Sequence, residues 1–171
     1  LCVIAYFSYA ADGVDYTADF VEGSPEVKSI NALTFGPEGI LFLGDSKSAK
    51  VYAIETGDTK ANRIETLELS KVDELIASSL GTTKDDISIQ DMVINPISKA
   101  TYFAVALGDG TPVLLKLVDN TFENVSLKNI KYAEAPISNV LAEDAEDRRG
   151  RSLRIWTVSD LNYYDGQVMV S

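Results

Sequence analysis

At residues 30–43 the sequence reads Ile30-Asn31-Ala32-Leu33-Thr34-Phe35-Gly36-Pro37-Glu38-Gly39-Ile40-Leu41-Phe42-Leu43. Two apolar runs flank a short turn. Pro37 fixes φ at the start of the turn, and Gly39 readily adopts the positive φ that its end requires. The stretch therefore predicts a β-hairpin, and the rest of the chain repeats its pattern.

The hairpin pattern recurs twice along the chain. Residues 89–96 and 158–166 each predict a short strand and a turn built on Pro or Gly, and a second apolar strand follows each turn. Leu33, Met92 and Leu161 occupy equivalent positions when the three segments are aligned. These positions are further apart than the roughly 40–50 residues of a compact propeller blade, so we expect insertions between the repeats.

Further strands extend each hairpin into a four-stranded antiparallel blade. Residues 50–54 predict the third strand of the first blade, and residues 64–69, after a turn at Gly57 and Asp58, predict the fourth. We therefore expect an all-β chain that is a fragment of a β-propeller, with about two and a half blades. The blades are expected at about residues 29–69, 87–127 and 155–171, the last of them truncated.

Two insertions are expected between the blades. Residues 70–80 predict a short amphipathic helix, with Ser70 and Asp73 as a capping box and Gly81 as a left-handed C-terminal cap. We expect this helix to cover the outer rim of the blades. Residues 133–151 predict a long polar excursion.

The two ends of the sequence are interpreted separately. Residues 1–10 are uncharged and mostly apolar, and they end in Ser8, Tyr9 and Ala10. This pattern is typical of a truncated signal peptide and predicts export to the periplasm or the exterior. The alternating aromatic residues leave a buried first strand as the alternative. Residues 167–171 predict a strand with no turn after it, so we interpret the sequence as an internal piece of a longer protein.

The charge and composition exclude several classes of function. The formal net charge of −11 argues against binding to nucleic acid or to anionic lipid, because both need a basic surface. The chain has no His, which excludes a Ser-His-Asp triad and the usual zinc enzyme sites. Cys2 stands alone, so no disulfide forms within the chain. The apolar run at the start has about 10 residues, and a membrane span needs about 20, so we expect none in the mature chain.

Residues 35–46, which run on into residues 49–54, resemble a blade of the NHL and SMP-30/gluconolactonase group of β-propellers. The longer stretch 30–171 resembles a family of uncharacterised secreted bacterial propellers. The resemblance rests on turn and core residues. It implies a propeller fold, and such propellers serve as lactonases, sugar-binding modules, quinoprotein enzymes and scaffolds.

Three polar residues lie near the starts of the predicted inner strands. Asp91 and Asp160 directly precede the aligned Met92 and Leu161, whereas Asn31 is offset by one position. Carboxylate and amide oxygens that converge on a propeller axis suit Ca²⁺ or Mg²⁺. The resemblance to the SMP-30-like group implies a divalent metal held by side chains of this kind. The alternative is that these residues hydrogen-bond to neighbouring blades or cap turns.

Three other features allow a functional interpretation, but a structural one is favoured for each. Residues 45–47 suit a local turn. Residues 143–147 suit a solvated acidic loop more than a cation site. Trp156, Tyr163 and Tyr164 suit core positions of strands, with a platform for sugar stacking as the alternative.

The predicted function is an exported binding or scaffold module. The sequence identifies no specific ligand, and an extracellular protein and a carbohydrate are the two classes of partner considered. Loops on a rigid disc present a recognition face without any catalytic residue. The alternative is a divalent-metal-dependent hydrolase of the SMP-30/lactonase type, in which Asp91 and Asp160 hold Ca²⁺ or Mg²⁺ and the metal activates water. For a third possibility, a quinoprotein-like dehydrogenase, the sequence shows no cofactor signature.

Overall fold

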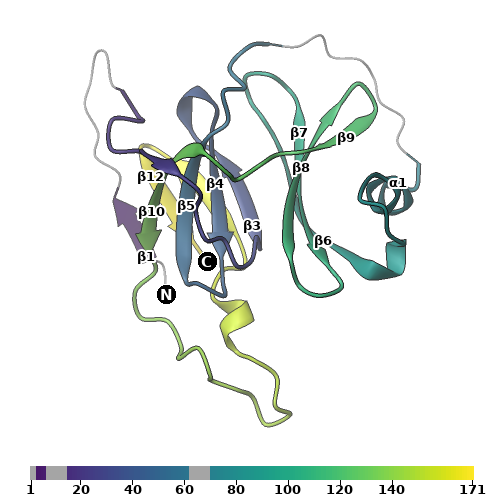
Figure 1. Cartoon of the computed structure of the whole chain (residues 1–171). Helices are drawn as coiled ribbons and strands as arrows, with labels where there is room; N and C mark the ends of the chain where they lie inside the picture. Colours follow the sequence, from purple (N-terminus) through teal and green to yellow (C-terminus); the bar gives the residue numbers. More distant parts are fainter. Residues whose placement is uncertain (1–2, 7–14, 62–69) are drawn as a thin grey trace.

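The computed structural model describes residues 3–6, 15–61 and 70–171, and for residues 3–6 it describes the backbone alone. Its strands pair antiparallel and form three sheets, which pack face to face as layers (Figure 1). The all-β class predicted from the sequence is confirmed. Within the described ranges there is one α-helix, α1 (Val72–Ser79), and no helix there is long and apolar enough to cross a membrane.

The first sheet is built on the hairpin of residues 30–43. The predicted turn is present as a short 3-10 helix, η1 (Pro37–Gly39), in which Gly39 has φ +74°. Every residue of β4 is buried, because this strand lies inside the sheet and apolar layers cover both faces. From edge to edge the strands are β2 (Val21–Gly23), β10 (Ile130–Pro136), β5 (Lys50–Glu55), β4 (Ile40–Asp45) and β3 (Ala32–Phe35).

Strand β10 departs from the sequence prediction. It pairs antiparallel with β5, with Tyr132 opposite Ile54. The strand expected beside β5, residues 64–69, lies outside the described residues. The polar excursion expected to begin at residue 133 has the wrong boundary, because residues 133–136 complete β10. The physical reason is that β5 is buried, so the backbone groups on its second side need a partner.

The second and third sheets contain the other two predicted hairpins. Asp165 and Gly166 both have positive φ and make the two-residue turn between β11 and β12. Residues 3–6 form strand β1 beside β12, which is the alternative that the sequence left open for this segment, and the signal peptide stays a prediction. The second sheet has the order β6 (Ile87–Ile94), β7 (Thr101–Leu107), β8 (Pro112–Val118), β9 (Thr121–Asn124), and the third has the order β1 (Val3–Tyr6), β12 (Gln167–Val170), β11 (Leu161–Tyr164).

The first sheet lies between the other two. Its edge strand β3 contacts both β6 of the second sheet and β11 of the third, so the first strands of the three hairpins adjoin (Figure 1). Along the chain, the whole second sheet comes between β5 and β10, which are neighbours in the first sheet. In a propeller whose blades follow one another along the chain, each blade is complete before the next begins. Here the first sheet is completed by β10, which comes after the second sheet in the chain.

Apolar layers hold the three sheets and the helix together. The layer between the first and second sheets includes Phe35 and Tyr102, whose rings meet edge to face with centroids 5.2 Å apart. The layer between the first and third sheets includes Val158 and Leu161. A third layer lies between the second sheet and α1, where Ile76 is fully buried. Because each large side chain contributes about 1.5–3 kcal/mol on full burial, these layers are the main source of stability.

Helix α1 lies within the predicted range 70–80 and differs from the prediction at its N-terminus. At the C-terminal end Gly81 has φ +70°, and the N–H of Thr82 donates to the carbonyl of Ala77 at 2.9 Å, as in a Schellman cap. The predicted capping box headed by Ser70 is wrong. Lys71 is the N-cap residue, and no side chain bonds to the first amides, because Ser70 stands one residue too early to reach them.

A buried hydroxyl ties the first sheet to the third. Ser46, in the turn between β4 and β5, is fully buried. Its hydroxyl accepts a hydrogen bond from the N–H of Val158 at 3.0 Å and donates to the carbonyl of the same residue at 3.3 Å. The two groups of Val158 thus have partners inside the protein, and the third sheet is held in a fixed position against the β4–β5 turn.

A partly buried carboxylate, whose side chain is 10% exposed, ties the first sheet to the second. Asp58, which follows β5, accepts hydrogen bonds from the hydroxyls of Ser98 (2.6 Å) and Tyr102 (3.0 Å) and pairs with Lys116 at 3.0 Å. Burial raises the pKa of the Asp58 carboxyl, but the bonds from Ser98, Lys116 and Tyr102 outweigh burial, so the pKa lies below its ordinary value. Burial and then the charge of Asp58 raise the pKa of the Tyr102 phenol, which therefore stays a neutral donor.

The first prediction concerns the close approach of the first and third sheets. A Cβ at Gly44 would lie 2.6 Å from Cγ1 of Val158 and 3.3 Å from Cδ1 of Leu161. We expect Gly44→Ala to displace the third sheet and to lower the free energy of unfolding by about 1–3 kcal/mol, measured by urea denaturation. Gly108→Ala is the control, because its Cβ would meet nothing closer than 3.5 Å. Equal losses in the two variants would contradict the prediction.

The second prediction concerns Asp58. The variant Asp58→Ala leaves Ser98, Tyr102 and Lys116 without their acceptor, so we expect it to lower the free energy of unfolding by about 3 kcal/mol at neutral pH. Asp85→Ala removes the same charge at an exposed position and should change stability by less than about 0.5 kcal/mol.

The pH dependence of this effect follows from the lowered pKa of Asp58. A carboxyl whose pKa is lower in the folded state stabilises fully above its unfolded value of about 3.9 and loses that effect as the pH falls through the folded value. The difference between wild type and Asp58→Ala should therefore narrow in acid. A difference that stays constant in a pH series of denaturant titrations would refute the assignment.

Candidate functional site

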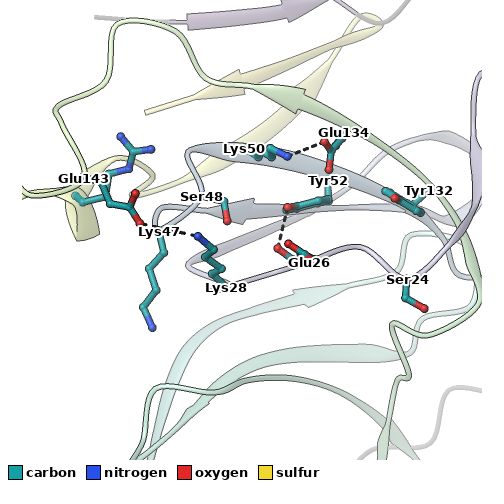
Figure 2. A pocket seen from close by; sticks show the side chains of 11 residues that line it. Ser24, Glu26, Lys28, Lys47, Ser48, Lys50, Tyr52, Tyr132, Glu134 and Glu143 are labelled. Carbon is teal, nitrogen blue, oxygen red and sulfur yellow. Dashed lines mark hydrogen bonds and ion pairs between the residues drawn. The ribbon is translucent and has the colours of Figure 1, made fainter.

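An open pocket of about 390 Å³ lies along β5 and β10, on the face of the first sheet that packs against the second (Figure 2). Side chains from residues 24–28, the β4–β5 turn, β5, β10 and the loop of residues 137–160 line it. Four lysine or arginine side chains and three carboxylates take part, which gives the lining a formal charge of +1 in a chain of −11.

Two polar pairs form the floor of the pocket. The ammonium of Lys50 lies 2.6 Å from the carboxylate of Glu134, and the hydroxyl of Tyr52 donates to the carbonyl of Glu26 at 3.0 Å (Figure 2). The hydrogen bond to Glu134 raises the pKa of Lys50, which keeps the ammonium charged. Burial raises the pKa of the Tyr52 phenol, so the hydroxyl stays protonated. The floor therefore has a fixed charge pattern.

One wall of the pocket consists of residues 24–28 and the β4–β5 turn, and Asp45, behind the lining, fixes these two segments to each other. Its buried carboxylate accepts hydrogen bonds from the N–H of Lys28 (2.7 Å), the hydroxyl of Ser29 (2.7 Å) and the N–H of Ser48 (3.0 Å). The bond to Ser48 closes the β4–β5 turn, so the local role predicted for Asp45 is confirmed. The bonds to Lys28 and Ser29 hold the preceding segment against this turn.

Asn31, a predicted metal ligand, supports the same wall. Its side-chain oxygen accepts a hydrogen bond from the N–H of Ser46 at 3.1 Å and shares the single proton of the Ser29 hydroxyl, 2.8 Å away, with Asp45. The amide oxygen is thus occupied by groups of the protein. Asn31 positions the segment that carries Lys28.

Arg154, in η3 (Arg154–Trp156), fastens the loop of residues 137–160 beside the pocket. Its Nε donates to the carbonyl of Ser46 at 3.1 Å, and its Nη1 donates to the carbonyl of Leu141 at 2.5 Å. The loop carries Glu143, whose carboxylate lies 3.9 Å from the ammonium of Lys28. The loop predicted as a polar excursion thus becomes one side of the pocket.

The other two predicted metal ligands bond to backbone amides. Asp91 accepts hydrogen bonds from the N–H of Leu33 on β3 and from the N–H of Met92, each at 2.7 Å. A bulge in β6 just before Asp91 interrupts the pairing with β7. Asp160 accepts a hydrogen bond from the N–H of Leu161 at 2.9 Å. Like Asp91, it therefore binds the amide of the residue that follows it.

The structure does not join the three predicted ligands through side-chain contacts. Among the described residues, none of Asn31, Asp91 and Asp160 hydrogen-bonds to another of the three. No group of three or more acidic or thiol side chains in the described ranges is placed to hold a metal ion. A Ca²⁺ or Mg²⁺ site at these residues stays a prediction.

The remaining candidates lie outside the pocket. Asp147, in the acidic run, accepts hydrogen bonds from the N–H groups of Arg149 and Arg151, and the backbone bond from Arg151 is the largest cause of its lowered pKa. These bonds fit the predicted solvated loop. Tyr163 is half-buried, packs against the core and stacks on Phe42. The core positions favoured for Trp156 and Tyr164 are wrong, because their side chains point to solvent and are 70% and 72% exposed.

Sequence reasoning missed most of the pocket. Tyr132 and Glu134 were not singled out, because their strand pairs with residues far away in the chain. The signal was present in the alternation of residues 130–136, which places Ile130, Tyr132 and Glu134 on one face. Lys50 was expected as part of a strand and not as part of a site.

The third prediction separates the structural role of Asp91 from a metal-binding role. We expect Asp91→Ala to lower stability by about 1–2 kcal/mol, because the N–H of Leu33 loses its acceptor. Asp160→Ala should cost less, because it removes one local bond. The thermal melts are measured in calcium chloride, in magnesium chloride and in EDTA, and we expect the same shifts in all three. A wild-type melting temperature that rises with metal, and does not rise in these variants, would establish the metal site.

Comparison with known proteins assigns no family to this chain: no protein-family model matches it, and no curated protein or solved structure is significantly similar to it. The functional argument therefore rests on the pocket and its residues.

Proposed function

We propose that the chain is part of an exported binding module of the β-propeller type and that the pocket on β5 and β10 binds a polar ligand of the carbohydrate class. The pocket is the observation that carries this proposal. It is open, and rigid strands and a bonded turn position its polar groups. The adjoining first strands of the three hairpins support the propeller part of the proposal, and the apolar run of residues 1–10 supports export.

The chemistry of the lining suits a hydroxylated ligand. A sugar hydroxyl donates to a carboxylate and accepts from an ammonium, so adjacent hydroxyls can bridge the pair formed by Lys50 and Glu134. Tyr132, beside this pair on β10, is half-buried and offers a ring on which a sugar face can pack. The hydroxyls of Ser24 and Ser48 add further polar partners.

The alternative function is a divalent-metal-dependent hydrolase of the lactonase type. In that case Asp91 and Asp160 would hold the metal, and the metal would lower the pKa of a bound water. The hydrogen bonds of Asp91 to two backbone amides favour the binding module over this alternative. Hydrolysis of a lactone that requires Ca²⁺ or Mg²⁺ and is lost in Asp160→Ala would establish the hydrolase.

The fourth prediction tests the pocket with a pair of tyrosine variants. A panel of neutral and acidic oligosaccharides is titrated into the protein by isothermal titration calorimetry. We expect Tyr132→Ala to weaken binding of the best ligand about tenfold, because a stacking contact contributes about 1 kcal/mol and loss of the ring also opens the site to water. Tyr164→Ala is the matched control, because it removes an exposed tyrosine outside the pocket lining.

Melting temperatures of both variants are measured alongside, to check that the proteins are folded. Tyr132 also packs against the apolar layer between the first and second sheets, so Tyr132→Phe serves as the conservative variant and should bind like wild type. Equal binding by Tyr132→Ala and Tyr164→Ala would place the ligand elsewhere, and no binding by any saccharide would refute the carbohydrate assignment.

A further inference from the structure

The loop of residues 137–160 places a carboxylate at the mouth of the pocket. Glu143 reaches toward Lys28, and Figure 2 shows its carboxylate beside the ammonium of that residue, close to the base of Lys47. The two charged atoms are 3.9 Å apart, and the side chains of Lys28 and Glu143 are 56% and 78% exposed. An ion pair of this length and exposure contributes little to stability, so another carboxylate can replace Glu143 at small cost.

The cations of the pocket differ in how their charges are balanced. Lys50 is matched by Glu134 at 2.6 Å. Lys47 donates to the carbonyl of Gly110, and Arg154 donates to two carbonyls, so within the described part of the chain neither forms an ion pair. Beside the Lys50–Glu134 pair, the lining therefore holds three cations, Lys28, Lys47 and Arg154, against two carboxylates, those of Glu26 and Glu143. This leaves a net charge of +1, so an incoming anion would be attracted there even though the chain as a whole is strongly acidic.

The backbone around this charge cluster is fixed in advance. Asp45 accepts hydrogen bonds from the N–H groups of Lys28 and Ser48. Arg154 donates to the carbonyl of Ser46 and so anchors the loop on which Glu143 lies. A ligand that binds here does not have to order these segments, so little of the binding energy is spent on conformational entropy. A surface cluster of lysines without such support would lack this advantage.

We propose that the pocket recognises its ligand by a carboxylate, which binds beside Lys28 in the place of the Glu143 carboxylate, so that Glu143 competes with the ligand. The inference rests on the proposed function and names its ligand class, a saccharide that carries a uronic acid. A carboxylate is favoured over a phosphate because the group that the protein itself places beside Lys28 is a singly charged carboxylate. The hydroxyls of the same saccharide meet the polar floor formed by Lys50 and Glu134.

Two variants, each of which removes one charge of the Lys28–Glu143 pair, test this proposal. Trigalacturonic acid is titrated into the full chain by isothermal titration calorimetry, with neutral galactotriose and inorganic phosphate as comparison probes. Glu143→Gln removes the competing carboxylate. We expect this variant to bind trigalacturonic acid about two- to fivefold more tightly, because breaking an exposed ion pair changes the affinity by about this factor. Lys28→Met keeps the length of the side chain, and we expect it to bind the acid about tenfold more weakly, because it loses a charged hydrogen-bond donor.

A matched control separates the local effect from the change in net charge. Glu123→Gln makes the same change on β9, at an exposed position outside the pocket lining, and should bind trigalacturonic acid like wild type. Salt should reduce the differences between the variants, because all the charges involved are exposed to solvent. Melting temperatures of the variants should match that of wild type, because both side chains of the pair are mostly exposed.

Each outcome supports or overturns one of the two proposals. If Glu143→Gln binds no more tightly than Glu123→Gln, the competition is refuted. If galactotriose binds as well as trigalacturonic acid and Lys28→Met leaves both unchanged, the carbohydrate module stands and the carboxylate inference fails. If inorganic phosphate competes with the acid at equal concentration, the anion is not specifically a carboxylate. If neither saccharide binds to any variant, the proposed function itself is refuted.

Discussion

The turn between β4 and β5 is the constraint on which the rest of the structure depends. Two buried polar residues hold two distant parts of the chain here: Asp45, at the end of β4, binds the N–H of Lys28 and the hydroxyl of Ser29, and Ser46, in the turn, binds both Val158 and Arg154. A buried carboxylate or hydroxyl is stable only when hydrogen bonds replace its hydration, so these segments cannot shift independently of the turn. One turn therefore positions a wall of the pocket, the third sheet and the loop at the pocket mouth.

Short acidic side chains serve this fold mainly by satisfying backbone amides. A strand at the edge of a sheet leaves amides without a partner, and Asp91 supplies one to Leu33 across the junction of two sheets. Asp160 binds the amide that follows it in the same way as Asp91 does. The recurrence of Asp before the aligned apolar residue thus has a structural explanation, in addition to the metal-binding one that the spacing suggested.

The local parts of the structure were predictable from the sequence, and the non-local parts were not. The hairpin at Pro37 and Gly39 and the helix that ends at Gly81 follow from turn and cap chemistry that acts within a few residues. The pairing of β10 with β5 is not encoded in either segment alone, because an alternating strand pairs with any edge that offers the right register. Most of the pocket was missed for the same reason, since its residues come from five segments that only long-range pairing and hydrogen bonds bring together. The role of Asp58 was missed because its partners on the second sheet lie about 40 residues away in the chain.

The insertion of the second sheet between β5 and β10 has a consequence for the order of folding. Strand β5 ends at Glu55 and β10 begins at Ile130, so these two strands can pair only after the residues of the whole second sheet have been synthesised between them. The second sheet consists of consecutive hairpins, so its contacts are local and we expect it to form early. Its formation shortens the distance between β5 and β10, the two strands that it separates along the chain. Until β10 has been synthesised, the edge of β5 that pairs with it has no β10 partner, and we expect the apolar side chains of β5 to be less well covered. We therefore expect the chain to be most prone to aggregate before β10 docks, a strand whose polar residues also complete the pocket.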